Sequence, residues 1–302
     1  MTVIIFLIAT LLLMLIGGET LKEIKILKQD FNSLLKIMCL EEILKIFGNL
    51  EWKNYQNIIK DEELKNSGLF AEFNKRITDD EFQGVYQDIN FKICETSLIY
   101  HTGSGRYEGD IDVFKGVVIT FDYNKDINNR TIISPKGDLT LKNSYWIYIV
   151  SLLPIIGNII RDTESLISLL IAVLVVFIGG LIIYKKELKK EEPLDSVVLE
   201  DCDFIKKYNV YSSDQVEARY IITPAFIERF KNFKTAFNSK KIKCAFYGKK
   251  LIIAISTNQN LFELGHVFKP LKSPCYTNSC YNQLSSIYKM IEYFKLTEKT
   301  KL

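Results

Sequence analysis

The sequence has few of the residues that enzymes most often use for chemistry. It also lacks the short motifs in which such residues usually occur. Its two histidines, His101 and His266, are too few and too isolated for a zinc site unless carboxylates join them. The patterns H-E-x-x-H, G-x-S-x-G and G-x-x-x-x-G-K-S/T do not occur. Acidic pairs such as Asp110 and Asp112 are common on surfaces, and two carboxylates need different environments before they act as acid and base. The sequence therefore predicts no catalytic residue, no metal site and no cofactor.

Cysteine is also scarce, and its spacing excludes a repeating disulfide or zinc framework. Cys275 and Cys280 have four residues between them, whereas zinc ligands commonly have two between them and come in two pairs. We expect reduced thiols, several of them in the cores of strands. The six cysteines are Cys39, Cys94, Cys202, Cys244, Cys275 and Cys280.

A strong overall charge is lacking as well, but the two parts of the chain differ. Residues 1–184 hold 18 basic and 23 acidic side chains, a balance of −5, and residues 185–302 hold 21 and 13, a balance of +8. A basic carboxyl half is typical of contact with anionic lipid, with nucleic acid, or with the acidic amino half of the same chain. Because much of the excess directly follows an apolar run, we expect anionic lipid as the acidic partner and no nucleic acid.

The sequence does contain long apolar runs, although its mean hydropathy is only +0.07. Leu166–Tyr184 has about 19 residues without a charge, which at 1.5 Å each span roughly 28 Å, close to the ~30 Å hydrocarbon core of a bilayer. Trp146–Ile160 is shorter and by itself would also suit a re-entrant or buried segment. The polar turn Arg161–Ser165 joins the two runs, which predicts a transmembrane helical hairpin over residues 145–184.

A third apolar run, Val3–Ile16, predicts an N-terminal transmembrane anchor over residues 1–18, since no cleavage site for a signal peptide follows it. The basic residues that follow the apolar runs orient the chain by the positive-inside rule. The polar parts of the chain are therefore predicted to lie in the cytoplasm and the apolar runs in the membrane. The expected membrane-interface anchors are Trp146, Tyr184, Lys185, Lys186, Lys189 and Lys190.

The polar parts of the chain predict the α+β class: an antiparallel sheet meander with packed helices, forming one domain that the hairpin interrupts. Residues 19–66 have apolar side chains at helical spacing and form an expected helical segment. Residues 67–144 are the expected first half of the domain, mainly strands. Residues 185–302 are the expected second half.

Local patterns place the elements of the first half. Thr78–Glu81 has the pattern of a capping box, which predicts the start of a helix. Alternating apolar side chains predict strands over Phe91–Tyr100 and Val113–Phe121, and Asp122–Asn129 has the composition of a turn.

A glycine-rich loop over residues 102–110 invites interpretation as a phosphate-binding loop. However, Glu108 stands where the G-x-G-x-x-G pattern requires glycine, and a predicted strand rather than a helix follows. A hairpin loop is therefore the preferred interpretation.

In the second half, Val197–Leu199 suits a short strand, and Ser212–Gln215 and Thr223 have the chemistry of helix N-caps. Ile242–Phe246 and Leu251–Ser256 flank Gly248 as a predicted hairpin. Two further helices are expected to bury one face each, through Phe226, Phe230, Phe233 and Phe237, and through Leu284, Ile287, Ile291 and Phe294.

The polar run Ser212–Tyr220 is the best candidate for a functional surface. Asp214, Glu217 and Arg219 fall near one helix N-terminus, with Glu217 three residues beyond Asp214 on the same face. A cap with a structural salt bridge would explain this run, and a docking or ligand surface is the alternative. The candidate interaction surface comprises Ser212, Asp214, Glu217 and Arg219.

The order of motifs from residue 67 onward resembles a bacterial family of membrane proteins with a domain of unknown function, often labelled "galanin". Val113–Asp122, Tyr211–Tyr220 and Thr223–Phe230 carry the resemblance, which covers most of residues 67–302 outside the hairpin. In the family the spans precede the domain, whereas here the hairpin interrupts it. The resemblance implies the class of integral membrane proteins and the inner membrane of a bacterium as the location, and it implies no chemistry.

These observations favour a non-enzymatic, membrane-anchored binding or scaffold module with an unknown protein partner. The alternative is a membrane-bound hydrolase that uses Asp214, Glu217, His101 or His266, which requires a pocket that brings at least two of them together. A transporter or channel is disfavoured, because no charge lies inside any of the predicted spans.

Overall fold

The structure is a computed structural model, and it divides the chain into two compact units. It describes residues 23–24, 26–27, 30–31, 33–54, 56–102, 109–138, 174, 177–179, 194–239, 241–264 and 274–299. One unit comprises Met1–Leu50 and Asn260–Leu284, and the other comprises Glu51–Gln259 and Ser285–Leu302. We describe each unit by itself.

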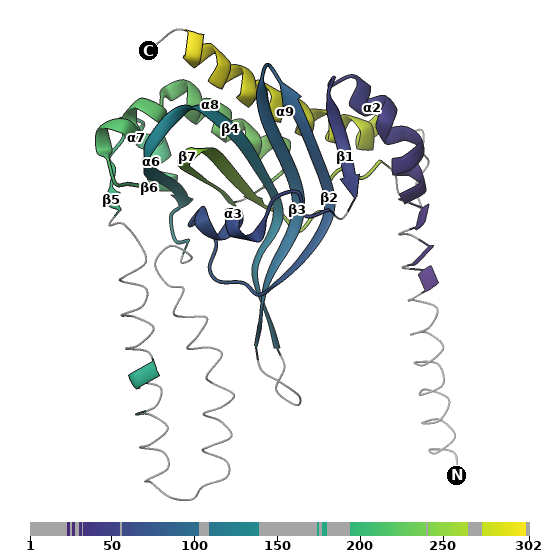
Figure 1. The fold of residues 1–302 in the computed structure, drawn as a ribbon, viewed down its shortest axis with the longest axis horizontal. Coiled ribbons are helices and arrows are strands. Elements are labelled where there is room, and N and C mark those ends of the chain that lie inside the picture. The colour runs from purple at the N-terminus through teal and green to yellow at the C-terminus, as the bar shows by residue number, and fades with distance from the viewer. Residues whose placement is uncertain are drawn as a thin grey trace, which may run out of the picture. The chain divides into compact units, whose positions relative to one another are not determined.

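The larger unit is built on one sheet, for which the described residues supply seven strands (Figure 1). The strand order is β1-β2-β3-β4-β6-β5, and β7 pairs with β4. All pairings among β2 to β7 are antiparallel, so the predicted antiparallel sheet is confirmed. The strands are β1 (Leu50–Asn54), β2 (Lys75–Tyr86), β3 (Ile89–Thr102), β4 (Gly109–Pro135), β5 (Asp195–Ser196), β6 (Tyr208–Ser212) and β7 (Lys241–Ser256).

Two predicted helical regions contain strands instead. The residues Thr78–Glu81 lie inside β2, where the pairing with β3 shifts register between Thr78 and Glu81. The polar side chains that resemble a capping box therefore mark a β-bulge, and the sequence pattern alone cannot distinguish the two. The expected helical segment 19–66 is likewise interrupted by β1, which pairs with β2.

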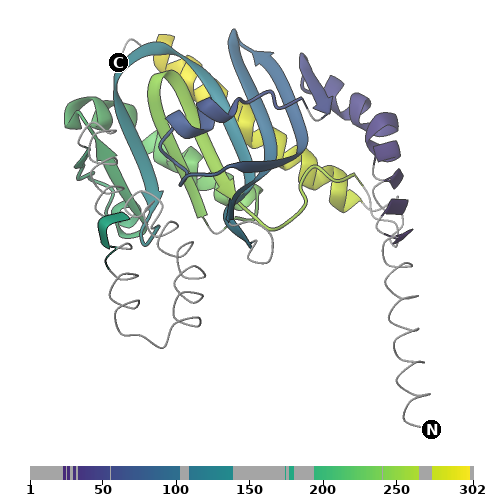
Figure 2. The same ribbon diagram turned by 60° about the horizontal axis from the view of Figure 1, so that its bottom comes forward.

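The pairing of β4 with β7 runs through two predicted turns. β4 continues through residues 122–129, with register shifts on either side of Ile127. β7 pairs with it from Ser256, opposite Gly116, to Cys244, opposite Ile133, so both arms of the predicted hairpin at Gly248 pair with β4. The bulges bend both strands, as Figure 2 shows.

Helices cover both faces of this sheet. On one face, α3 (Asp61–Asn66) and the chain beside it bury Leu64, Phe70 and Phe73 against Cys94 and Phe114 (Figure 1). On the other face lies α8 (Pro224–Ala236), which Thr223 caps through a bond from the Phe226 amide of 3.2 Å. The predicted phenylalanine stripe is confirmed, because Phe226, Phe230, Phe233 and Phe237 are each at most 1% exposed.

The last helix, α9 (Pro274–Lys299), contains the residues Leu284 to Phe294 for which the sequence predicted a helix. The part of α9 from Ser285 onward belongs to the larger unit. There Tyr288 packs its ring against those of Tyr86 and Phe91, with centroids 4.6 and 5.5 Å away. The Tyr86 hydroxyl donates to Glu292 at 3.0 Å. This part of α9 is therefore held against β2 and β3.

The smaller unit is helical in the part described. A π-helical turn, η1 (Lys36–Leu40), continues into α2 (Glu41–Lys45). Lys36 is buried and bonds Glu263 at 3.1 Å, which ties η1 to the segment that precedes α9. The ring of Phe47 lies 5.5 Å from that of Tyr281.

The predicted transmembrane hairpin requires correction. Among the residues that the structure describes, no helix is both long enough and apolar enough to cross a membrane. The prediction rested on uncharged apolar runs joined by a polar turn, whereas α9, with 26 residues, carries polar and charged side chains throughout. Residues 145–184 lie outside the described residues except Leu174 and residues 177–179, and the expected anchor over residues 1–18 lies outside them entirely.

Gly116 generates the first testable prediction. Its φ is +149°, and a Cβ built on it would lie 2.0 Å from the Ile255 carbonyl oxygen. We expect Gly116→Ala to lower the free energy of unfolding by about 2 kcal/mol or more, because the β4–β7 pairing would have to shift. Gly109→Ala is the matched control, since a Cβ there meets only Thr102 Oγ1 at 3.6 Å. Urea unfolding should separate the two variants, and equal losses would contradict the prediction.

Candidate functional site

The candidate surface at Ser212–Tyr220 forms the end of β6 and the helix that follows, α7 (Gln215–Ile221). Asp214 caps α7, because its Oδ1 accepts the backbone N–H groups of Val216 at 2.7 Å and Glu217 at 3.2 Å. Ser212 is buried and accepts the Asp214 N–H at 3.1 Å. The predicted cap is therefore confirmed, and an acidic cap also suits the positive end of the helix dipole.

Bonds to β4 hold the start of α7 against the sheet. Glu217 Oε2 accepts the Asn129 N–H at 3.1 Å, and the Ser212 and Thr131 hydroxyls lie 2.8 Å apart. The Ser213 N–H donates to the Arg130 carbonyl at 3.2 Å. Ser212, Asp214 and Glu217 thus position the helix, since each bonds a backbone group or another buried side chain.

The opposite face of α7 points to solvent and carries a different set of side chains. Val216 is 76% exposed and Tyr220 is 51% exposed, and Arg219, between them in the sequence, is exposed as well. Sequence reasoning selected Arg219 but missed Val216 and Tyr220. Their spacing of four residues, out of phase with buried Ala218 and Ile221, is the signal that would have found them.

A cavity of about 380 Å³ lies between β5, β6 and α6 (Cys202–Lys207). Its apolar lining includes Val197, Val198 and Ile205, and Lys136 and Lys206 supply positive charge. Lys206 is 73% exposed and pairs with Asp203 at 3.3 Å. The cavity volume lies within the range of small ligand pockets, and it would also accept one or two anchoring side chains of a partner.

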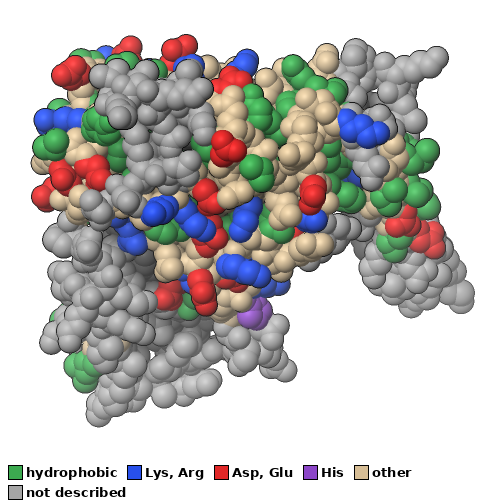
Figure 3. Space-filling model, turned by 45° about the horizontal axis from the view of Figure 1, so that its top comes forward, with side chains coloured by type: hydrophobic (Ala, Val, Ile, Leu, Met, Phe, Trp, Pro, Cys, Tyr) green, Lys and Arg blue, Asp and Glu red, His purple; other side chains and the backbone are tan. Residues whose placement is uncertain are grey.

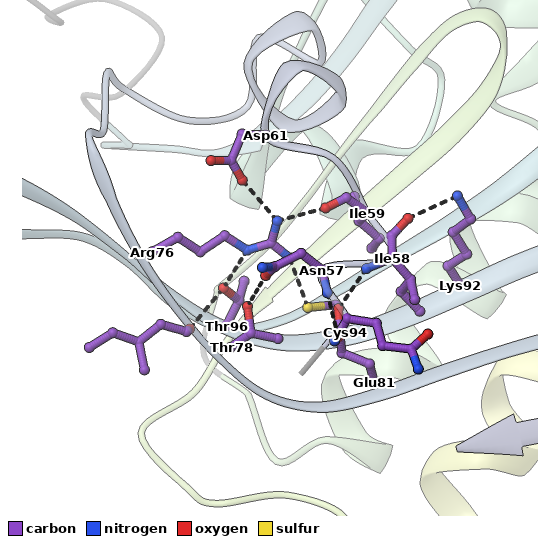
Figure 4. A network of polar contacts seen from close by, with 12 residues as sticks. Asn57, Ile58, Ile59, Asp61, Arg76, Thr78, Glu81, Lys92, Cys94 and Thr96 are labelled. Atoms are coloured by element: carbon purple, nitrogen blue, oxygen red, sulfur yellow. Dashed lines mark hydrogen bonds and ion pairs between the residues drawn. The ribbon is translucent and has the colours of Figure 1, made fainter. Parts of the chain in front are cut away.

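A buried polar network occupies another part of the larger unit (Figure 4). The Arg76 guanidinium donates to Asp61 at 2.9 Å, to the Ile59 carbonyl at 2.6 Å and to Cys94 Sγ at 3.1 Å. Burial is the main cause that raises the pKa of Cys94, to about 12. A thiol with so high a pKa stays protonated, so this network has a structural role.

Glu81, in the same network, binds backbone amides. Its carboxylate accepts the N–H groups of Gln56, Asn57 and Ile58 at 2.7, 2.8 and 2.9 Å (Figure 4). Three amide groups that converge in this way make an anion-binding site, and here the chain's own carboxylate fills it. The neighbouring Asp80 accepts the Trp52 indole N–H at 3.0 Å.

The two histidines are not brought to the candidate surface in the part of the chain described. His101 Nδ1 lies 2.6 Å from Asp110 Oδ1, at the end of the β3–β4 hairpin, and Lys75 binds the same carboxylate at 3.1 Å. Hydrogen bonds from His101 and then Lys75 lower the pKa of Asp110. The pairing of Thr102 with Gly109 confirms the predicted hairpin, and His266 lies outside the described residues.

The hydrolase interpretation gains no support from these positions. The cavity lining includes none of His101, Asp214 and Glu217. Among the described residues, no group of three or more His, Cys, Asp or Glu side chains is placed to hold a metal ion.

Charged side chains of both signs are mixed over the face in Figure 3, so this face has no large area of one charge that would attract a partner by itself.

The predicted membrane-interface anchors lie outside the described residues: Trp146, Tyr184, Lys185, Lys186, Lys189 and Lys190. Contact of the lysine cluster with anionic lipid therefore stays a prediction.

Comparisons with known proteins agree with part of the resemblance found in the sequence. The family model described as "Protein of unknown function (DUF3137)" matches residues 112–296. The match supports a domain of unknown function and supports neither the label "galanin" nor a membrane location. Among curated proteins, none matches the chain.

One solved structure is similar to the chain, the crystal structure of the mycobacterial trehalose monomycolate transport factor A, TtfA. The two are 10% identical with a TM-score of 0.36, and the alignment covers 83% of this chain and 91% of that one. A similarity at this level carries no conclusion about fold or function.

The cap of α7 generates the second prediction. Asp214→Ala removes the acceptor for two backbone N–H groups, so we expect the free energy of unfolding to fall by about 1 kcal/mol. Asp214→Asn keeps an acceptor oxygen and should cost less. Urea unfolding of the two variants tests this order, and equal stability of the wild-type and alanine proteins would contradict it.

The described cysteines generate the third prediction. Cys202 is exposed, whereas Cys94, Cys244 and Cys280 are buried and reduced, as the sequence predicted for several of the thiols. We expect a thiol reagent at pH 8 to alkylate Cys202 quickly and the three buried thiols only after unfolding. With a pKa of about 12, only about one Cys94 thiol in ten thousand is ionised at that pH.

Mass spectrometry of the alkylated peptides measures the four rates in one sample. Cys39→Ser and Cys275→Ser, introduced together, simplify the measurement. Equal rates at Cys94 and Cys202 in the native protein would contradict the assignment.

Proposed function

The chain belongs to the family described as "Protein of unknown function (DUF3137)", whose model matches more than half of its 302 residues, and we propose that it is a non-enzymatic binding module. Its partner is a protein, and the contact surface is the outward face of α7. The observation that carries the proposal is the pair Val216 and Tyr220, which are 76% and 51% exposed on a helix whose start is hydrogen-bonded to β4.

The rigid support of α7 favours a binding role. Ser212, Asp214 and Glu217 bond the helix start and β4, so the outward side chains are presented by a fixed backbone. A surface ordered before association loses less conformational entropy when a partner binds.

The side chains on this face also suit a protein contact. Tyrosine and arginine are enriched among residues that contribute most to binding energy, and an exposed valine beside them adds apolar surface. The partner surface that complements these groups presents apolar or aromatic side chains together with acidic ones.

Site-specific photo-crosslinking tests this function, which is the fourth prediction. A photoreactive amino acid placed at Val216 or Tyr220, in the cells that naturally make the chain, should form an adduct with one defined protein. Glu228 is exposed on α8 and serves as the matched control position. An adduct yield at Val216 no higher than at Glu228 would contradict the proposal.

The crosslinked protein, once identified by mass spectrometry, permits a quantitative test. We expect Val216→Asp and Tyr220→Ala each to raise the Kd for the purified partner at least tenfold, or about 1.4 kcal/mol. Glu228→Ala should leave the Kd unchanged. Since both residues are exposed, thermal unfolding should be the same in all three variants.

A further inference from the structure

The cavity between β5, β6 and α6 has no part in the proposed contact at α7. Its volume of about 380 Å³ is near the lower end of the range for small-ligand sites. Three short segments that lie side by side in Figure 1 surround it, namely the chain from Ser196 to Val198, the helix α6 and the first residues of β6, and Lys136 completes the lining. A site of this size has room for one small molecule.

Backbone bonds hold the walls of this cavity in place. The Val197 N–H donates to the Val210 carbonyl at 2.8 Å, which joins the first wall to β6. The Lys136 N–H donates to the Lys207 carbonyl at 2.8 Å, which places Lys136 beside the end of α6. Because these bonds join backbone atoms, the cavity exists before a ligand arrives, and binding requires little ordering of the chain.

Packing beneath α6 fixes the remaining wall. Asp201 caps the helix, since its Oδ1 accepts the Phe204 N–H at 2.8 Å. The Phe204 ring stacks on that of Tyr208 with centroids 4.7 Å apart, and the Phe230 ring of α8 lies 6.1 and 5.4 Å from these two rings. The helix is thus fastened to the core, so the backbone that carries its cavity-lining side chains is held in place.

The lining combines an apolar surface with positive charge. Val197, Val198 and Ile205 supply apolar side chains, and Lys136 and Lys206 supply two ammonium groups. Among the described residues that line the cavity, none is acidic. An apolar chain or ring would bury its surface against the valines and the isoleucine, and an anionic group would meet the lysines.

The ion pair that Lys206 makes is weak enough to be exchanged for a ligand. Lys206 binds Asp203 at 3.3 Å, and the two side chains are 73% and 78% exposed. A pair so exposed to solvent contributes little to stability. Lys136 is exposed as well. Both ammonium groups can therefore turn to an anion at the open side of the cavity.

We propose that this cavity is a second binding site, for a small amphipathic anion: a single apolar chain or ring that ends in a carboxylate, phosphate or sulfate. The two lysines disfavour a cationic ligand, because like charges would meet it. The apolar lining disfavours a small polar ion, which would lose water there and gain no apolar contact. The site goes beyond the proposed protein contact at α7 and does not depend on it.

Protection of Cys202 from alkylation tests the proposal, which is the fifth prediction. Cys202 lines the cavity and is exposed, so a bound ligand covers it. We expect decanoate, at about ten times its Kd, to slow the reaction of Cys202 with iodoacetamide roughly tenfold, because about one cavity in eleven is then empty. The full chain is used, and mass spectrometry of the alkylated peptide measures the rate.

Two other ligands separate the contributions of charge and chain. Decyltrimethylammonium has the same apolar chain with a positive head group, and acetate has the carboxylate without the chain. Neither should protect Cys202 at the concentration at which decanoate does, with each ligand kept below the concentration at which it forms micelles. Equal protection by either of them, or no protection by decanoate, would overturn the proposal.

A double variant tests the two lysines. Lys136→Gln with Lys206→Gln should raise the Kd for decanoate about tenfold, because each lysine supplies a charge-assisted hydrogen bond. Lys60→Gln with Lys234→Gln changes the net charge equally at exposed positions outside the lining and should leave the Kd unchanged. Each Kd is taken from the ratio of the rates with and without decanoate in the same variant, because the lysines also affect the reactivity of the thiol. Equal Kd values in the two double variants would overturn the role of the lysines.

Two further comparisons separate this site from other contacts. Val216→Asp, on α7, should leave the protection of Cys202 unchanged, so failure of this site and failure of the proposed function are distinguishable. Vesicles of phosphatidylglycerol should not protect Cys202, since the ligand enters the cavity as a single molecule. Protection by the vesicles alone would overturn the cavity site in favour of a membrane surface. All of these variants should keep the thermal unfolding temperature of the wild-type protein, because the replaced side chains are exposed.

Discussion

The two-sided pairing of β4 is the constraint on which most of the larger unit depends. Beside Val117 and Val118 this strand pairs with β3 and β7, and beside Thr131 and Ile132 it pairs with β6 and β7. Both of its hydrogen-bonding edges are thus in use at each of these points. Since β6 leads directly into α7, the position of the proposed binding face follows from the second half of β4. A Cβ at Gly116 would lie 2.0 Å from the Ile255 carbonyl oxygen, so the pairing of β4 with β7 leaves no space for a side chain there.

Several carboxylates in this protein satisfy backbone donors. Asp214 caps α7, Glu217 bonds the Asn129 amide, and Glu81 binds three amides in the loop before α3. Buried N–H groups need acceptors, and a carboxylate that meets this need is held by it. The acidic residues that sequence reasoning considered for chemistry at the candidate surface are therefore part of its support. The side chains that α7 exposes include Val216, Arg219 and Tyr220.

The proposed contact face of α7 is small and mixed in character, and hydrogen bonds to β4 hold the start of the helix, which suits recognition of one partner.

The sequence by itself determined the elements whose signals lie within a few residues. The caps Asp214 and Thr223, the phenylalanine face of α8, the strands around Phe91 and Val113, and the hairpin between Thr102 and Gly109 are of this kind, because a cap or an alternating pattern acts within one turn or one strand.

Only the tertiary structure decided which local patterns form the helix or turn that they predict and which become part of a strand. Thr78–Glu81 has a helix-start pattern but lies in β2, since its backbone pairs with β3 and the amides of residues 56–58 bind the Glu81 carboxylate. Residues 122–129 and Gly248 have turn composition, yet the β4–β7 pairing continues through them with bulges. Apolar length predicted a hairpin in the membrane, and no described helix supports it. The physical reason is common to all of these: long-range strand pairing and burial contribute more free energy than local propensity, and neither can be read from a short window of sequence.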